Sequence, residues 1–375
     1  MKMSLSKNKK RRILLMGLTG AVERPSAYFR FFANQSGFCV NVFTYGNRGG
    51  IPLLGRLLSL LHGAISVIHA DVVVVLPMSQ TKPIFMTLMR LARLFKKRII
   101  LDFYISVYES ELQREAFLKE SHLGQRMLAQ ERIAVHLSDI VIFLSQSEKV
   151  HYMKLLDLPA SASQTAIVHL VTERKPQARL PFTKSVGNNR PLIVWWARLG
   201  NPIHGFEVIA ETIKILLNSG FHGRFGIYGD GEDEYASARL KYPFLFEAES
   251  VDFRLDVNFS NGKLNRILEN EADIALGAFG TSEKARTVIL NKIVEASAYG
   301  IPSITCWSTG VSEIYVERSS ILFSESTPQG LAQMIQKTTG SPEQIKVIGE
   351  NARKTFQNHF SERAFEERLS LIFKD

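Results

Sequence analysis

Short apolar runs alternate with longer amphipathic stretches along most of the chain, and this rhythm limits the possible folds more than any other feature. In the first half, strands are expected at 12–16, 40–44, 72–76, 98–102, 140–144 and 165–169, and helices at 25–35, 53–65, 83–95 and 124–136. Strands that alternate with helices in this way are typical of a parallel sheet covered by helices on both faces.

The rhythm stops at residues 174–190, RKPQARLPFTKSVGNNR, which lack periodicity and contain Pro, Gly and Asn. This composition predicts an interdomain linker. The rhythm then restarts, with strands expected at 192–197, 224–228, 252–257, 274–277, 302–305 and 320–323, and helices at 205–217, 262–270, 288–299 and 328–337. The sequence therefore predicts an α/β protein with doubly wound domains at 1–173 and 191–350, followed by an amphipathic C-terminal helix within 351–375.

Charge is distributed unevenly between the two halves. Residues 1–180 hold 25 Lys and Arg against 12 Asp and Glu, a net charge of +13, whereas residues 181–375 hold 21 against 24, a net charge of −3. This asymmetry predicts that the first half meets anionic material. The zinc spacing and aromatic interleaving of common nucleic-acid modules are absent, so no nucleic-acid partner is expected.

Segment 81–98, TKPIFMTLMRLARLFKKR, combines apolar residues with Arg90, Arg93, Lys96 and Lys97. Its apolar face suits either the cover of a sheet or the interface of an anionic membrane, and the cations favour a peripheral membrane encounter. No uncharged apolar stretch of about 18 residues is present, so no membrane-spanning helix is expected.

Cys39 and Cys306 show no metal-ligand spacing and are expected to be reduced packing residues. A cytoplasmic location, with peripheral contact at the inner face of the cell membrane, is the resulting expectation.

Glycines end two of the expected strands, in LLMGLTG (Gly17, Gly20) and FGIYGDGE (Gly229). Glycine permits positive φ and close approach of the backbone to a diphosphate at a helix N-terminus. Neither segment matches the dinucleotide fingerprint or a Walker loop, so tight strand-to-helix turns are the alternative interpretation.

Three further segments carry candidate ligand-binding residues. In IVWWARLGNPIHGFEVIAE, Arg198 ends a strand and His204 precedes a helix, although both suit ordinary surface positions as well. KARTVILNKIVEASAYGIP places Lys284, Arg286 and Thr287 in a loop, then Lys292 and Glu295 on one helix face. That pair is either a surface salt bridge or the lining of a cleft. In WSTGVSE, the turn at Thr309 and Gly310 offers backbone amides to an anion.

These segments, LGAFGTSEKARTVILNKIVEASAYGIPSIT together with PIHGFEVI, GDGE and EADIAL, resemble the nucleotide-sugar domain of GT-B glycosyltransferases, in particular glycosyltransferase family 4. The resemblance implies two facing Rossmann-like domains, with the C-terminal helix crossing back to the first. It also implies that the acceptor binds to the first domain and the nucleotide-sugar donor to the second.

For single residues, the resemblance implies that Glu295 holds the ribose hydroxyls, with Lys292 near phosphate or orienting that carboxylate. Thr287 stands where many family members have a second glutamate, and His204 where many have a lysine. Lys284 and Arg286 are expected to supply the missing positive charge, and the contact to the sugar is left open.

Transfer of a sugar requires stabilisation of the departing diphosphate by a metal ion or by preorganised cations and amides. The acidic segment 229–234, GDGEDE, is interpreted as a glycine turn followed by a solvated loop, so no metal is expected. Arg198, Lys284 and Arg286 then carry the stabilisation. Asp102, at the end of a strand, is a candidate to orient or deprotonate the acceptor hydroxyl, or else a residue that caps the next turn.

The leading hypothesis is a metal-independent, retaining glycosyltransferase that moves a sugar from a nucleotide-sugar to a glycan or lipid-linked acceptor, in surface polysaccharide or lipopolysaccharide synthesis. One alternative is a nucleotide-sugar epimerase of the same architecture. A second is a catalytically silent protein that binds sugar nucleotides or nucleic acid.

Overall fold

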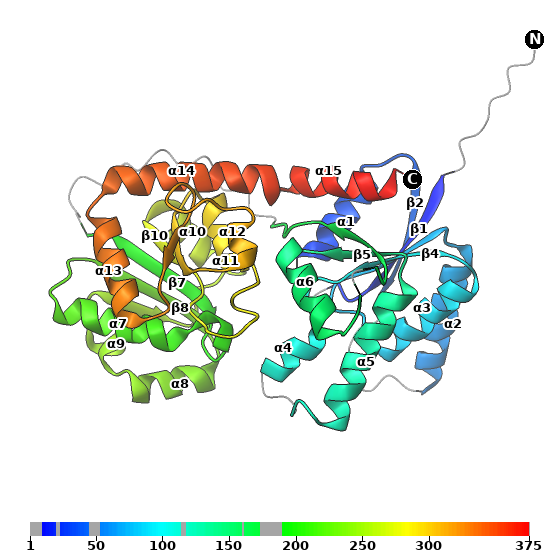
Figure 1. Cartoon of the computed structure of the whole chain (residues 1–375), viewed down its shortest axis with the longest axis horizontal. Coiled ribbons are helices and arrows are strands. Elements are labelled where there is room, and N and C mark those ends of the chain that lie inside the picture. Colours follow the sequence, from blue (N-terminus) through cyan, green and yellow to red (C-terminus); the bar gives the residue numbers. More distant parts are fainter. Residues whose placement is uncertain are drawn as a thin grey trace, which may run out of the picture. The chain divides into compact units, whose positions relative to one another are not determined.

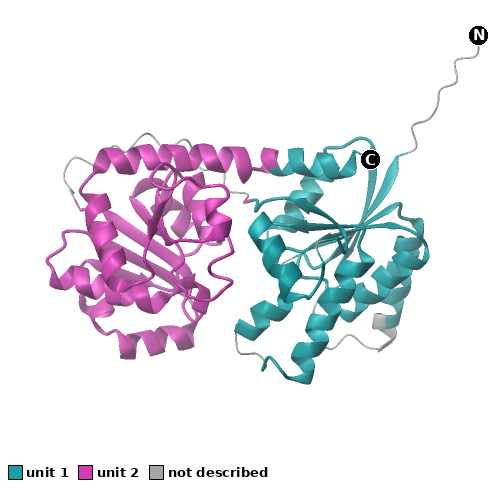
Figure 2. Cartoon of the chain, viewed as in Figure 1, with its two compact units in different colours: residues 1–171, 365–375 teal, residues 172–364 magenta. Residues whose placement is uncertain are grey.

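The computed structural model describes residues 10–19, 23–44, 53–113, 118–159, 161–172 and 190–374. The chain divides into two compact units, one formed by residues 1–171 with 365–375 and the other by residues 172–364 (Figure 2). The predicted linker at 174–190 lies outside the described residues except for Arg190.

The first unit is built on one parallel sheet (Figure 1). Its order among the described residues is β2-β1-β3-β4-β5-β6, with β1 Arg11–Gly17, β2 Phe38–Thr44, β3 Val72–Val75, β4 Arg98–Asp102, β5 Ile140–Phe143 and β6 Gln164–Ile167. The helices are α1 Arg24–Ala33, α2 Leu53–His69, α3 Pro83–Leu94, α4 Val107–Gln113, α5 His122–Leu137, α6 Gln146–Leu155 and α15 Glu362–Phe373.

Both faces of this sheet are buried, which explains why its central strands are continuous apolar runs such as VVVV in β3. Side chains of α2, α3, α5 and α6 cover one face, and those of α1 and α15 cover the other. Phe365 and Leu369 of α15 are buried in the second of these cores. The C-terminal helix therefore completes the first unit, as the predicted architecture requires.

The second unit repeats the plan. Its parallel sheet has the order β12-β11-β10-β7-β8-β9 among the described residues, with β7 Leu192–Arg198, β8 Arg224–Asp230, β9 Val251–Arg254, β10 Ile274–Leu276, β11 Ser303–Cys306 and β12 Leu322–Ser324. The helices are η1 Pro202–His204, α7 Phe206–Asn218, α8 Glu232–Lys241, α9 Phe244–Glu247, α10 Lys263–Asn270, α11 Asn291–Ala298, α12 Thr309–Ser312, α13 Pro328–Thr339 and α14 Pro342–His359.

Two sequence predictions are corrected by these elements. Residues 232–234 are not a solvated loop but the first turn of α8, where three carboxylates face the positive end of the helix dipole. Cys39 is exposed on β2 rather than packed, whereas Cys306 is buried as predicted.

A buried carboxylate joins three segments at the carboxyl end of the first sheet. Glu131 of α5 is fully buried and accepts hydrogen bonds from Ser106 Oγ at 2.7 Å, the Val107 amide at 2.6 Å and Gln80 Nε2 at 3.2 Å. It thereby caps the start of α4. Burial raises the pKa of Glu131 to about 7, against the effect of these donors.

Because of Glu131, the free energy of unfolding of the chain is expected to fall as pH rises from about 5 to about 8. The folded chain holds the proton up to a pKa of about 7 and the unfolded chain only up to 4.5, so protonation favours the fold below neutral pH. Between about pH 5 and about pH 8, the wild type should lose about 2.5 kcal/mol of unfolding free energy relative to Glu131→Gln, which cannot titrate. Urea unfolding of both proteins at the two pH values measures this. Parallel pH profiles would contradict it.

Candidate functional site

The carboxyl end of the second sheet brings several of the predicted residues together. Trp196 Nε1 on β7 donates a hydrogen bond to Glu295 Oε2 on α11, at 3.0 Å. Two residues beyond Trp196, Arg198 ends the strand and is exposed to solvent, where its Nε lies 3.6 Å from Glu234 Oε1. Open α/β sheets bind ligands at the carboxyl ends of their strands.

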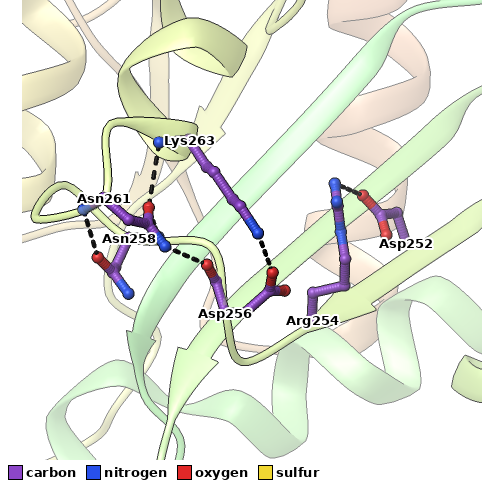
Figure 3. Close-up of polar contacts among 6 residues, drawn as sticks. All are labelled: Asp252, Arg254, Asp256, Asn258, Asn261 and Lys263. Carbon is purple, nitrogen blue, oxygen red and sulfur yellow. Dashed lines mark hydrogen bonds and ion pairs between the residues drawn. The ribbon is translucent and has the colours of Figure 1, made fainter.

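The loop after β9 places an aromatic ring against Trp196. Phe259 meets the Trp196 ring edge-on, with 6.4 Å between centroids. Figure 3 shows the contacts that hold this loop: Lys263 pairs with Asp256, Asn261 Nδ2 donates to the Asp256 carbonyl at 2.5 Å, and the Asn261 amide donates to Asn258 Oδ1 at 3.1 Å. The position of Phe259 is therefore fixed by its own loop.

Lys292 is not part of a surface salt bridge. Its side chain is only 5% exposed, its Nζ donates to the Gly277 carbonyl at 3.4 Å, and the same atom lies 4.6 Å from the centre of the Trp195 ring. Glu295, one turn later, is half-buried. Within the described part of the chain, Lys292 has no ion-pair partner within 4.0 Å. Burial lowers the pKa of Lys292 well below its usual value, and Glu295 opposes this shift.

His204 lies beside this lysine. Gly205, with φ of +62°, lets the η1 turn approach the loop after β10 so closely that a Cβ on Gly205 would lie 2.4 Å from the Phe279 carbonyl carbon. Burial, followed by the charge of Lys292, lowers the pKa of His204 to about 2, so its imidazole is neutral at neutral pH. Its Nδ1 is buried without a hydrogen-bond partner among the described residues.

The loop of Arg286 and the turn at Thr309 are also brought together. The Thr309 amide and Oγ1 donate to the Arg286 carbonyl at 2.8 and 3.0 Å, and a Cβ on Gly310 would lie 2.2 Å from the Thr287 carbonyl oxygen. The Thr309 amide is therefore bonded within the protein and does not offer itself to an anion, whereas anion binding by the Gly310 amide stays a prediction. Arg286 itself is exposed, whereas Lys284 is buried.

The three glycines predicted to lie in tight turns after strands have different outcomes. Gly17 ends β1 with φ of +152°, and a Cβ there would lie only 2.4 Å from Ser79 Oγ, which accepts from the Leu18 amide at 2.9 Å. Gly229 lies inside β8 opposite Ala197, because the strand runs two residues further than predicted, and the turn falls at Gly231. Gly20 lies outside the described residues.

Asp102 has a different position from the one predicted for an acceptor base. It is fully buried in the first unit, and its Oδ2 accepts from Arg24 Nε at 2.5 Å and Tyr28 Oη at 2.7 Å. A side chain enclosed in this way is not accessible to an acceptor hydroxyl, and its geometry is that of a structural ion pair.

Neither a metal-binding cluster nor a membrane-spanning helix is found in the described ranges. No group of three or more His, Cys, Asp or Glu side chains within them is placed to bind a metal ion. No helix within them is long and apolar enough to cross a membrane.

Sequence reasoning missed the aromatic part of this site. The Trp195 ring lies under the amino group of Lys292, Trp196 binds Glu295, and Phe259 from the loop after β9 packs edge-on against Trp196. The tandem WW before Arg198 was the available signal, but in sequence it was indistinguishable from two strand residues.

No family model and no curated protein sequence matches the chain. Solved structures do match it along nearly its whole length. Anabaena HepE in complex with UDP and glucose superposes with a TM-score of 0.65 at 15% identity, over 97% of this chain and 99% of that one. The chain has the GT-B fold.

Other GT-B structures agree. Sucrose-phosphate synthase from Thermosynechococcus elongatus gives a TM-score of 0.70 at 14% identity, over 97% of this chain and 98% of that one. A glycosyltransferase from Rickettsia africae gives 0.67 at 14% identity, with the same coverage. A putative UDP-N-acetylglucosamine 2-epimerase from Listeria monocytogenes gives 0.58 at 12% identity, over 98% of both chains. Two reaction classes thus share this fold.

Proposed function

We propose that the protein is a glycosyltransferase that uses a nucleotide-sugar donor, bound at the carboxyl end of the second sheet. The observation that carries this proposal is the Glu295 carboxylate held by Trp196 beside the exposed Arg198. A carboxylate accepts two hydroxyl hydrogen bonds at once, as a ribose requires, and an exposed guanidinium suits a diphosphate. Anabaena HepE, which has this fold and was solved with UDP and with UDP-glucose, supports the same assignment.

The proposed acceptor is a glycan or a lipid-linked glycan that binds to the first unit, and the proposed product is surface polysaccharide or lipopolysaccharide. We further propose a metal-independent reaction of the family 4 type with retention of configuration. Arg198, with Lys284 and Arg286 of the neighbouring loop, stabilises the departing diphosphate. Lys292, whose pKa burial lowers, takes up a proton as this anion binds. The proposed setting is the cytoplasmic side of a membrane.

The second candidate is a nucleotide-sugar epimerase, favoured by the likeness to the putative epimerase from Listeria monocytogenes. The two activities differ in their need for an acceptor. An epimerase converts its nucleotide-sugar without one, whereas a transferase consumes the donor at a rate set by the acceptor. Product analysis of a purified nucleotide-sugar incubated with the protein alone distinguishes them.

Glu295→Gln and Arg198→Ala are expected to weaken nucleoside diphosphate binding by roughly 5- to 100-fold each, since each removes charge-assisted hydrogen bonds. Calorimetry with UDP, and then with GDP and ADP, measures the affinities. Glu343→Gln, an exposed carboxylate on α14, is the matched control and should bind like the wild type. Unchanged affinity in both site variants, for a diphosphate that the wild type binds, would refute the proposed site.

A further inference from the structure

One helix of the first unit presents a continuous apolar face to solvent. Five large apolar side chains of α2 are 41–57% exposed, and they are Leu57, Leu58, Leu61, Ile65 and Ile68. Their spacing follows the helical repeat, so all five lie on one side of the helix. We call these five residues the apolar face of α2.

The contacts of α2 with the core are made by other residues of the helix. Val67 is buried against the sheet, with Leu60 and Ala64 packed beside it. At Gly63 a Cβ would lie 2.7 Å from Leu88 Cδ1 of α3, so the two helices are already in close contact (Figure 1). The apolar face of α2 therefore points away from both the sheet and α3.

A basic surface adjoins the C-terminal end of α2. The strands that follow α2 and α3 are parallel and paired, with Val72 opposite Arg98. Both helices therefore end near the amino ends of these two strands. There Arg93, Lys96, Lys97 and Arg98, with Asp139, line an open depression of about 400 Å³. Leu94 and Phe95, between these cations, are 75% and 44% exposed.

We propose that the apolar face of α2 and the basic end of α3 together dock the protein on an anionic phospholipid bilayer. An amphipathic helix lies in such an interface with its apolar side at the acyl boundary, and flanking cations bind the headgroups. The apolar side of α3, which the sequence suggested for this role, is instead buried in the core through Phe85, Leu88 and Ala92.

Charge decides between a bilayer and a second copy of the chain. On this surface Arg90, Arg93 and Lys96 are exposed, with Lys97 and Arg98 half-buried beside them, and the nearby carboxylates Asp71 and Asp139 are each paired with an arginine. A two-fold dimer through this surface would place the cations against themselves, because such an interface uses the same patch on both partners. An anionic bilayer neutralises them instead. This inference does not depend on glycosyl transfer, and its test uses no activity.

The test is sedimentation of the full chain with phosphatidylcholine vesicles, with and without phosphatidylglycerol. Binding is expected only to the anionic vesicles and should weaken with salt. Leu61→Gln with Ile65→Gln should reduce the partition coefficient at least tenfold, and Arg90→Gln with Lys96→Gln by roughly fivefold for each lost cation. All four side chains are exposed, so the fold is expected to persist, and circular dichroism checks this.

Leu240→Gln is the matched control, because Leu240 on α8 is 87% exposed but belongs to the second unit. It should bind vesicles like the wild type. The proposal is overturned if the wild type does not bind anionic vesicles at low salt, or if the α2 variant binds them unchanged. It is likewise overturned if light scattering finds a dimer that the α2 variant abolishes while vesicles do not compete.

Discussion

Replacing Arg24 by methionine is expected to lower the free energy of unfolding of the first unit by about 3–5 kcal/mol. Arg24 begins α1, and its side chain is 1% exposed. Besides Asp102, it donates to the carbonyls of His169 at 2.6 Å and Val168 at 3.0 Å, and its guanidinium lies 5.0 Å from the Phe365 ring centre. Its loss leaves Asp102 buried without a counter-charge.

Urea unfolding monitored by circular dichroism measures this loss. The matched control is Arg93→Met, which breaks the Arg93–Asp139 pair at the surface, where both side chains are at least one-third exposed. That change should cost less than about 1 kcal/mol. The double variant Arg24→Met with Asp102→Leu removes both buried charges and should recover most of the stability. A cost below that of the control would show that the buried pair does not hold the first unit together.

The Arg24–Asp102 pair also illustrates what sequence reasoning misses. Apolar runs predicted every strand within a few residues, because a parallel sheet buried on both faces needs continuous apolar strands. The role of Asp102 was not predictable in this way. Asp102 ends strand β4, whereas its partner Arg24 is 78 positions away, at the start of helix α1. A polar residue at a strand end has the same sequence signature whether it faces a ligand or an ion pair.

The candidate site shows a similar division. The spacing of Lys292 and Glu295 correctly placed both on one side of a helix, because the helical repeat is a local property. Their burial was not local. It depends on Trp195 and Trp196 of β7, about a hundred positions earlier, which cover the lysine and bind the glutamate. Helix α8 was missed for the opposite reason, since its acidic start has no apolar periodicity to reveal it.

Lys292→Met is expected to stabilise the second unit while weakening nucleoside diphosphate binding by roughly 30- to 1,000-fold. Methionine fills nearly the same volume without a charge, and replacement of buried charges by packed apolar groups adds up to about 4 kcal/mol of stability. Affinity for the diphosphate falls because its proposed position is at the carboxyl ends of the strands above Lys292, where methionine provides no positive charge. A purely structural lysine would instead give a less stable variant with unchanged affinity.

The pH dependence of binding separates this role from simple packing. An anion near Lys292 raises the pKa that burial has lowered, so the complex holds the proton more tightly than the free protein. Affinity for the diphosphate should therefore fall as pH rises between these two pKa values, and binding should take up protons there. Calorimetry in buffers of different ionisation enthalpy measures that uptake. The uptake should disappear in Lys292→Met but persist in Lys214→Met, an exposed lysine on α7. Equal uptake in both variants would place the titrating group elsewhere.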